Sequence, residues 1–185
     1  MIKQQFDEEK EVEELTKLLE ENHSKNQVAI IADLIYKKDS LFPILVYLSL
    51  KNQPIIPQRA SWVLEEISKN RPKWITPFIE EMTEKLSTLE HNGTQRNVTK
   101  ILARSPLSIK HLGGLLNTCF NWIQHRETAI AVRIPCMTIV HRISEIEPDI
   151  EAEFKELLYS FVETGSAGER SRAKLILKKM EQKYY

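Results

Sequence analysis

Residues 59–67 read Arg-Ala-Ser-Trp-Val-Leu-Glu-Glu-Ile, and this stretch decides the fold class. Its apolar residues Ala60, Val63, Leu64 and Ile67 recur three and four positions apart. At about 100° per residue, this spacing places them on one side of an α-helix. The stretch therefore predicts an amphipathic helix with one face that must be buried.

The same apolar stripe returns in every second predicted helix. Aligning these helices on Gln27, Arg59, Asn97, Pro135 and Arg172 gives separations of 32, 38, 38 and 37 residues. Apolar residues follow each aligned position after one, four, five and eight residues, with Ser105 as the exception. The other members are Val28, Ile31, Ala32 and Ile35; Ala60, Val63, Leu64 and Ile67; Val98, Ile101 and Leu102; Cys136, Ile139, Val140 and Ile143; and Ala173, Ile176, Leu177 and Met180. One such helix cannot bury its stripe alone, so the pattern predicts stacked repeats.

Helical spacing covers almost the whole chain and predicts ten helices without a sheet. The expected ranges are roughly 8–21, 24–37, 39–51, 57–69, 72–88, 92–104, 108–123, 128–145, 148–163 and 167–182. Ser24 with Gln27 and Ser166 with Glu169 form capping-box patterns, and Asn92 with Gln95 offers a third. Pro72 and Pro148 stand where a first-turn proline is tolerated. Short connections predict antiparallel neighbours, and we expect residues 1–185 to form one domain.

A period near 38 residues, two helices per unit and the stretch at 59–67 resemble HEAT repeats, over the whole chain. Together with Gly-Ser-Ala-Gly-Glu-Arg-Ser-Arg at 165–172, they also resemble a small bacterial group of stand-alone HEAT-like proteins without an established function. The resemblance implies an all-α fold, a right-handed α-solenoid of about five antiparallel helix pairs with an armadillo-type superhelix. Pro135 departs from the pattern and should kink its helix.

Composition and charge narrow the functional class. Lys and Arg together number 26, as do Asp and Glu, whereas a wholesale nucleic-acid binder is usually basic. The charge is uneven, because residues 1–21 carry a net −5 and residues 166–185 a net +4. The longest apolar stretch, residues 41–50, covers half of the roughly 20 residues that a membrane span needs. Two cysteines make no disulfide framework, so we expect a cytoplasmic protein. We also expect it to be monomeric and without membrane association.

The sequence carries no catalytic signature. The five histidines are scattered, no Cys-x-x-Cys exists, and nucleophile elbows, phosphate loops and dinucleotide fingerprints are missing. Glu90 and His91 adjoin in a predicted loop, and Cys136 falls on the apolar stripe. We therefore expect no enzyme activity, no cofactor and no metal.

The face of the second helices opposite the stripe predicts a binding surface. It comprises the positions one before and three, six and seven after each aligned residue, and it changes from acidic to basic along the chain. Trp62 is a large aromatic where helical spacing predicts solvent, although it could instead cover the neighbouring helix. We predict that this face binds an acidic segment of a protein partner. The residues proposed to bind it are Trp62, Arg96, Lys100, Arg104, His141 and Arg142.

Three alternatives stay open. The first is an anion site at the start of the last helix, formed by Ser166, Gly168, Arg170 and Arg172. The simpler interpretation is a capped turn in which the Glu169 carboxylate accepts hydrogen bonds from the same backbone amides. The second concerns the arginines near the starts of second helices, which HEAT-like proteins commonly use to link adjacent repeats: Arg59, Arg133, Arg170 and Arg172. The third is nucleic-acid backbone binding, implied by the fold resemblance to alkylpurine DNA glycosylases, whose functional residues we do not find matched here.

Overall fold

The computed structural model describes the backbone of residues 2–182 and the side chains of residues 9–182, and over this part of the chain it is helical without a strand. The helices are α1 (Ile2–Glu21), α2 (Lys25–Lys37), α3 (Leu41–Ser49), α4 (Ile56–Asn70), α5 (Pro72–Ile75), α6 (Ile79–Lys85), α7 (Asn92–Arg104), α8 (Leu112–Gln124), α9 (Ile130–Ser144), α10 (Glu151–Thr164) and α11 (Ala167–Gln182). Short 3-10 turns are η1 (Thr76–Phe78), η2 (Leu86–Thr88), η3 (Ile109–His111) and η4 (Pro148–Ile150).

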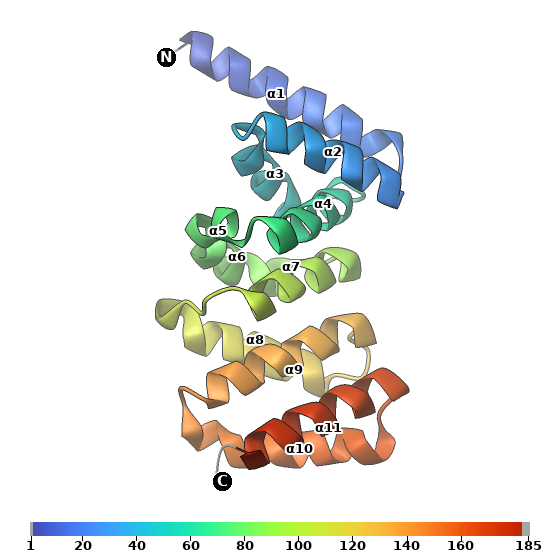
Figure 1. The fold of residues 1–185 in the computed structure, drawn as a ribbon, viewed down its shortest axis with the longest axis vertical. Helices are drawn as coiled ribbons and strands as arrows, with labels where there is room; N and C mark the ends of the chain where they lie inside the picture. Colours follow the sequence, from blue (N-terminus) through green and yellow to red (C-terminus); the bar gives the residue numbers. More distant parts are fainter. Residues whose placement is uncertain (1, 183–185) are drawn as a thin grey trace.

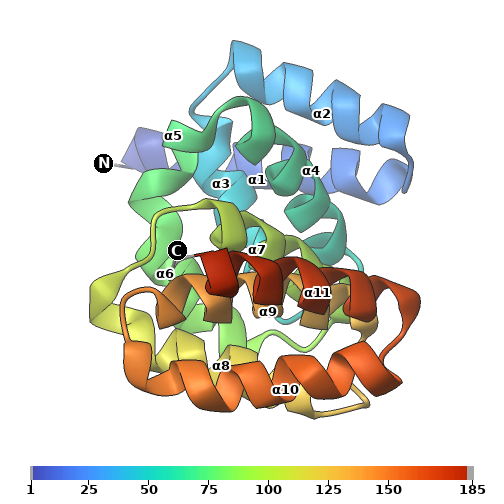
Figure 2. The same cartoon turned by 60° about the horizontal axis from the view of Figure 1, so that its bottom comes forward.

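These helices form a stack of antiparallel pairs, with α1 and α11 at opposite ends (Figure 1). The pairs are α1 with α2, α3 with α4, the broken helix α5–α6 with α7, α8 with α9, and α10 with α11. Figure 2 shows α10 and α11 side by side in the last pair. The second helices α2, α4, α7, α9 and α11 also pack on one another in succession. The predicted all-α solenoid is therefore confirmed.

The predicted stripe forms the centre of the core. Every apolar member from Val28 to Met180 is buried, and Leu64 and Ile101 are 0% and 1% exposed. Ser105, the exception in the sequence pattern, is only half-buried, and its hydroxyl donates to the Ile101 carbonyl. The register of the repeat is thus the one that the spacing predicts.

The predicted fifth helix, residues 72–88, is interrupted. It consists of α5, η1, α6 and η2, with Pro77 in the 3-10 turn η1. Proline has no backbone N–H to donate to the carbonyl four residues earlier, so a continuous α-helix loses a bond there. By contrast α9 continues through Pro135 from Ile130 to Ser144.

Two of the three predicted capping patterns hold at least in part. The Ser166 hydroxyl accepts the Glu169 N–H at 3.4 Å, and Glu169 Oε2 accepts the Ser166 N–H at 2.8 Å, which completes a capping box. Ser24 also caps its helix, but the Gln27 side chain donates to the Leu18 carbonyl instead of serving the cap. The prediction for Asn92 is wrong, as described next.

His91 caps α7 in place of Asn92. Its Nδ1 accepts the Gly93 N–H at 3.0 Å, and Asn92 is already the first residue of the helix. Gln95, the predicted partner of Asn92, donates its side-chain amide to the Leu89 carbonyl instead. The imidazole replaces the usual short oxygen side chain in satisfying a free helix N–H.

Arginines join neighbouring repeats, as the resemblance implied for Arg59 and Arg133. Arg59 Nη1 on α4 donates to the Leu19 and Glu20 carbonyls at the end of α1, at 2.7 and 2.9 Å. Arg133 on α9 forms an ion pair with Glu169 on α11 at 2.9 Å, with both side chains buried. Arg170 differs, because it donates to the Gly165 carbonyl of its own turn.

Candidate functional site

The second-helix face is hollowed over its first three helices. A hollow of about 490 Å³ is lined by residues of α2, α4 and α7, and we call it the Trp62 groove. Its lining residues are Lys25, Val28, Ala29, Trp62, Glu65, Glu66, Lys69, Arg96 and Lys100. An adjoining hollow of about 370 Å³ is lined by His23, Gln58, Trp62, Gly93, Arg96 and Asn97. Trp62 and Arg96 line both hollows and therefore stand between them.

Trp62 serves two purposes at once. Its indole is partly buried and packs against the core, and its ring meets His23 edge-on with centroids 5.0 Å apart. The remaining surface of the ring lines both hollows. Both sequence interpretations of Trp62 are thus compatible with its position: it covers its neighbour and still offers apolar surface.

The acids of this face are neutralised within the protein. Glu65 Oε1 accepts two bonds from the Arg104 guanidinium at 3.0 Å, and Glu65 Oε2 lies 2.9 Å from Lys69 Nζ. Lys69 also pairs with Glu66 at 2.9 Å. Burial by itself raises the pKa of the Glu65 carboxyl, but the bonds and charges of Lys69 and Arg104 outweigh it and hold the pKa below its ordinary value.

The solvent-side prediction for Glu65 is wrong, and Arg104 is already engaged within the fold. The helical offsets placed Glu65 on the solvent side, yet its side chain is 5% exposed beneath Arg104 and Lys69. Arg104, predicted to bind a partner, is bonded to Glu65 and also donates to the Ser68 hydroxyl at 3.0 Å. The cation is already used to join α7 to α4.

Arg96 and Lys100 lie one turn apart on α7 and remain available. Among the side chains of residues 9–182, none forms an ion pair with Lys100, Arg96 or Lys25. Arg96 donates only to the neighbouring Asn97 amide oxygen, at 3.3 Å. Burial is the main cause that lowers the pKa of Lys100; the charge of Glu65 raises it, and nearby Arg96 and other cations lower it further. The groove therefore holds two half-buried cations, Arg96 and Lys100, that form no ion pair with the described side chains.

His141 and Arg142 lie on α9, beyond the residues that line the groove. Arg142 Nη1 donates to the Leu102 and Ala103 carbonyls at 3.2 and 3.0 Å, which satisfies the end of α7. Burial is the main cause that lowers the pKa of its guanidinium. His141 is largely buried, with Nε2 at 4.0 Å from Glu145. Of the six predicted binding residues, three line the groove: Trp62, Arg96 and Lys100.

The sequence analysis missed the contribution of α2. Lys25, Val28 and Ala29 line the groove, and Ile30 is 50% exposed on the same helix. The offsets used for the other repeats give Asn26, Ile30, Asp33 and Leu34 in the first repeat, and none of these lines the groove. The periodicity therefore carried no signal for the α2 residues that line the groove.

The start of α11, the alternative anion site, is occupied by the chain itself. Glu169 Oε2 takes the Ser166 N–H, Arg170 donates to the Gly165 carbonyl at 2.6 Å, and a side chain on Gly168 would meet Ile134 at 3.0 Å. These contacts favour the capping interpretation, since a carboxylate already sits where an anion would bind. Arg172 is half-buried on the next turn.

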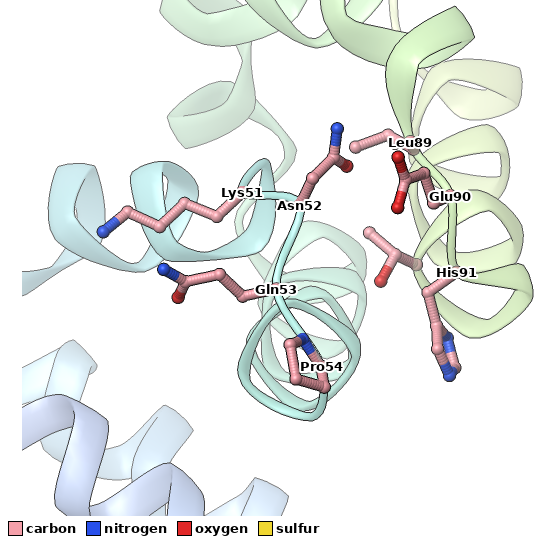
Figure 3. A pocket seen from close by; sticks show the side chains of 8 residues that line it. Lys51, Asn52, Gln53, Pro54, Leu89, Glu90 and His91 are labelled. Atoms are coloured by element: carbon pink, nitrogen blue, oxygen red, sulfur yellow. The ribbon is translucent and has the colours of Figure 1, made fainter.

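A third hollow, of about 300 Å³, lies between two loops on another part of the surface (Figure 3). Residues 51–54 form one wall and residues 89–91, with Thr94, the other. The Asn52 side chain donates to the Thr88 carbonyl at 2.8 Å and so ties the loops together. Figure 3 shows the Glu90 and His91 side chains pointing in different directions. Within the described part of the chain, no three His, Cys, Asp or Glu side chains gather as a metal site would need.

The HEAT repeat domain family matches residues 15–180, and the chain belongs to this family. No curated protein and no solved structure matches the chain. Across the described residues, no helix combines the length and apolarity needed to cross a membrane.

Proposed function

We propose that this HEAT repeat protein is a non-catalytic interaction module that binds an acidic segment of a partner protein in the Trp62 groove. The observation that carries the proposal is a pair of cations, Arg96 and Lys100, that form no ion pair with the side chains of residues 9–182 and lie beside an aromatic ring lining the same hollow. Family membership supports an interaction scaffold, since solenoids bind partners along an extended face without catalytic residues.

The chemistry of the groove favours carboxylates with an apolar neighbour. Lys100 is partly buried and forms no ion pair with the described side chains, so a ligand carboxylate would supply a partner. The Arg96 guanidinium can hold a carboxylate through two parallel bonds. Trp62 offers the kind of half-buried aromatic anchor on which interfaces concentrate their binding energy.

Nucleic-acid binding, the alternative function, is less well supported by the same contacts. It needs a continuous basic strip along the second helices. Arg104 is bonded to Glu65 and Arg142 to the end of α7, so two of the cations expected in that strip serve the fold. What remains in the groove is a local cluster, which suits a short acidic segment better than a phosphate backbone.

The test uses two labelled peptide pools and one duplex. The first pool has randomised apolar positions among Asp and Glu; the second is identical but carries Asn and Gln; the third probe is mixed-sequence DNA. Binding is measured by fluorescence anisotropy at increasing salt. The variant Arg96→Gln with Lys100→Gln removes the groove cations, and Lys73→Gln with Lys174→Gln removes two exposed cations elsewhere.

We expect the wild type and the Lys73/Lys174 control to bind the acidic pool, and the Arg96/Lys100 variant to lose at least tenfold in affinity. Equal binding by both variants would remove the groove as the site. Preference for DNA, with affinity falling steeply as salt rises, would instead assign the nucleic-acid function.

A further inference from the structure

Two cations line the Trp62 groove one helical turn apart. Arg96 and Lys100 stand four residues apart on α7, so they are neighbours on one face of that helix, with Cβ atoms about 5–6 Å apart. Both side chains are half-buried. Burial is the main cause that lowers the pKa of Lys100; the charge of Glu65 raises it, and the charge of Arg96 lowers it again. The two positive charges are therefore close enough to oppose each other.

The other charged residues of the groove leave this opposition in place. The Glu65 carboxylate is held by Arg104 and Lys69, and the Glu66 carboxylate by Lys69. Lys25 lines the groove from α2 and forms no ion pair with the described side chains. Among the described residues, four cations and two carboxylates line the hollow, which leaves an excess of two positive charges.

A ligand group with two negative charges matches this excess better than a carboxylate does. A carboxylate carries a single charge, so it would leave one of the two half-buried cations without a partner. A phosphate monoester carries a charge of about −1.5 to −2 at pH 7 and three strong acceptor oxygens. These oxygens can accept bonds from the Arg96 guanidinium and the Lys100 ammonium together. A phosphate of a nucleic-acid backbone is a diester and carries only one charge.

The surroundings of the two cations favour a phosphorylated side chain over free phosphate. Trp62 lines the same hollow and offers aromatic surface, and Val28 and Ala29 add apolar surface from α2. The adjoining hollow of about 370 Å³ shares Trp62 and Arg96 with the groove. Inorganic phosphate would leave the apolar surface and the second hollow unused, whereas the chain on either side of a phosphorylated residue can contact both.

We infer that the Trp62 groove binds a phosphorylated side chain of the partner protein, with the phosphate held by Arg96 and Lys100 and the flanking chain against Trp62. This inference rests on the proposed function, because it names the acidic group that the groove prefers. Binding of the partner then depends on its phosphorylation.

The experiment compares pairs of labelled peptides that differ in the charge of one side chain. The first pair carries phosphotyrosine or sulfotyrosine, which share a tetrahedral group but differ by about one charge at pH 7. The second pair carries phosphoserine or Glu. All four peptides share a Gly-Ser-Gln background with one Leu on each side of the variable residue, and inorganic phosphate serves as a competitor.

Dissociation constants are measured by fluorescence anisotropy at constant ionic strength. The proteins are wild type, Arg96→Gln, Lys100→Gln and the control Lys73→Gln, which removes an exposed cation of α5 outside the groove. Because neither Arg96 nor Lys100 forms an ion pair with the side chains of residues 9–182, both groove variants should keep the thermal midpoint of wild type.

We expect the phosphorylated member of at least one pair to bind at least about tenfold tighter than its singly charged counterpart, in wild type and in Lys73→Gln. Arg96→Gln and Lys100→Gln should each lower that ratio, since one remaining cation needs only one negative charge. Inorganic phosphate should compete far more weakly than the unlabelled phosphopeptide.

The outcomes separate this inference from the proposed function. Ratios below about tenfold in both pairs, with the Glu peptide still bound, would overturn the phosphate preference and leave acidic-segment binding in place. A ratio unchanged in both groove variants would also overturn it, because the phosphate would then bind elsewhere. Inorganic phosphate that competes as well as the phosphopeptide would overturn the phosphorylated side chain in favour of free phosphate. A lack of binding by all four peptides would overturn both proposals.

Discussion

The buried ion pair between Arg133 and Glu169 gives the sharpest prediction about the fold. Glu169 uses one oxygen for Arg133 Nη1 at 2.9 Å and the other for the Ser166 N–H at 2.8 Å. The two side chains are 5% and 2% exposed, and the Arg133 guanidinium lies over the Phe161 ring at 5.8 Å. Glu169→Ala therefore removes a helix cap and strands a buried cation. Losing one partner of a buried pair typically costs about 3–5 kcal/mol, whereas losing a cap costs about 1 kcal/mol.

We expect Glu169→Ala to lower the free energy of unfolding by about 3–5 kcal/mol in urea denaturation. Ser166→Ala, which touches only the cap, should cost about 1 kcal/mol. The double variant Arg133→Met with Glu169→Met should recover most of the loss, because no unpaired charge remains between α9 and α11. A Glu169→Ala variant no less stable than Ser166→Ala would refute the reasoning, since the pair would then contribute nothing beyond the cap.

Three further predictions concern stability. Leu64→Ala, at a fully buried position, should cost about 2–5 kcal/mol in the same assay, and a loss below about 1 kcal/mol would mean that the repeat register is wrong. Glu65→Gln should lower the free energy of unfolding at pH 7, and the difference from wild type should shrink on acidification. The folded protein holds the pKa of Glu65 below the unfolded value, near 4.3, so the ionised carboxylate stabilises the fold above that pH. This contribution is lost as the pH falls through the folded pKa. Ile55 has a positive φ of 73° in a γ-turn, in which the Ile56 N–H donates to the Pro54 carbonyl. Ile55→Gly should relieve this backbone strain and raise the thermal midpoint, corresponding to a gain of up to about 1 kcal/mol. A lower midpoint would show that Ile55 is not strained.

The fold could be predicted because burial follows from spacing alone. Apolar residues at offsets one, four, five and eight must share a helix face, and the repeat period fixes which helices stack. Features that depend on a single backbone choice were less predictable. Pro77 breaks the fifth helix, and Ile55 adopts a positive φ where glycine or asparagine would be expected. Proline type alone does not decide the outcome, because α9 runs on through Pro135, and isoleucine gives no signal for a positive φ.

The site was predicted in part, because periodicity gives direction but not partners. It placed Trp62, Arg96 and Lys100 on the hollowed face correctly. Periodicity does not predict the bond between Arg104 and Glu65, since that contact joins residues 39 positions apart in different repeats. The single domain, the monomeric state and the cytoplasmic location stay predictions.

The competition between folding and binding explains which cations a partner can use. A stack of helices leaves carbonyls unsatisfied where each helix ends, and a long guanidinium from the next repeat reaches them. Arg59 serves α1 in this way and Arg142 serves α7. Arg104 instead neutralises the buried Glu65, which would otherwise be a costly charge within the stack.

A count of basic residues along the second helices therefore overstates the charge that a ligand meets. Arg96 and Lys100 escape this use because the Glu65 carboxylate beside them is already satisfied by Arg104 and Lys69. Mutating Arg59, Arg104 or Arg142 should consequently change stability first, whereas mutating Arg96 or Lys100 should change binding first.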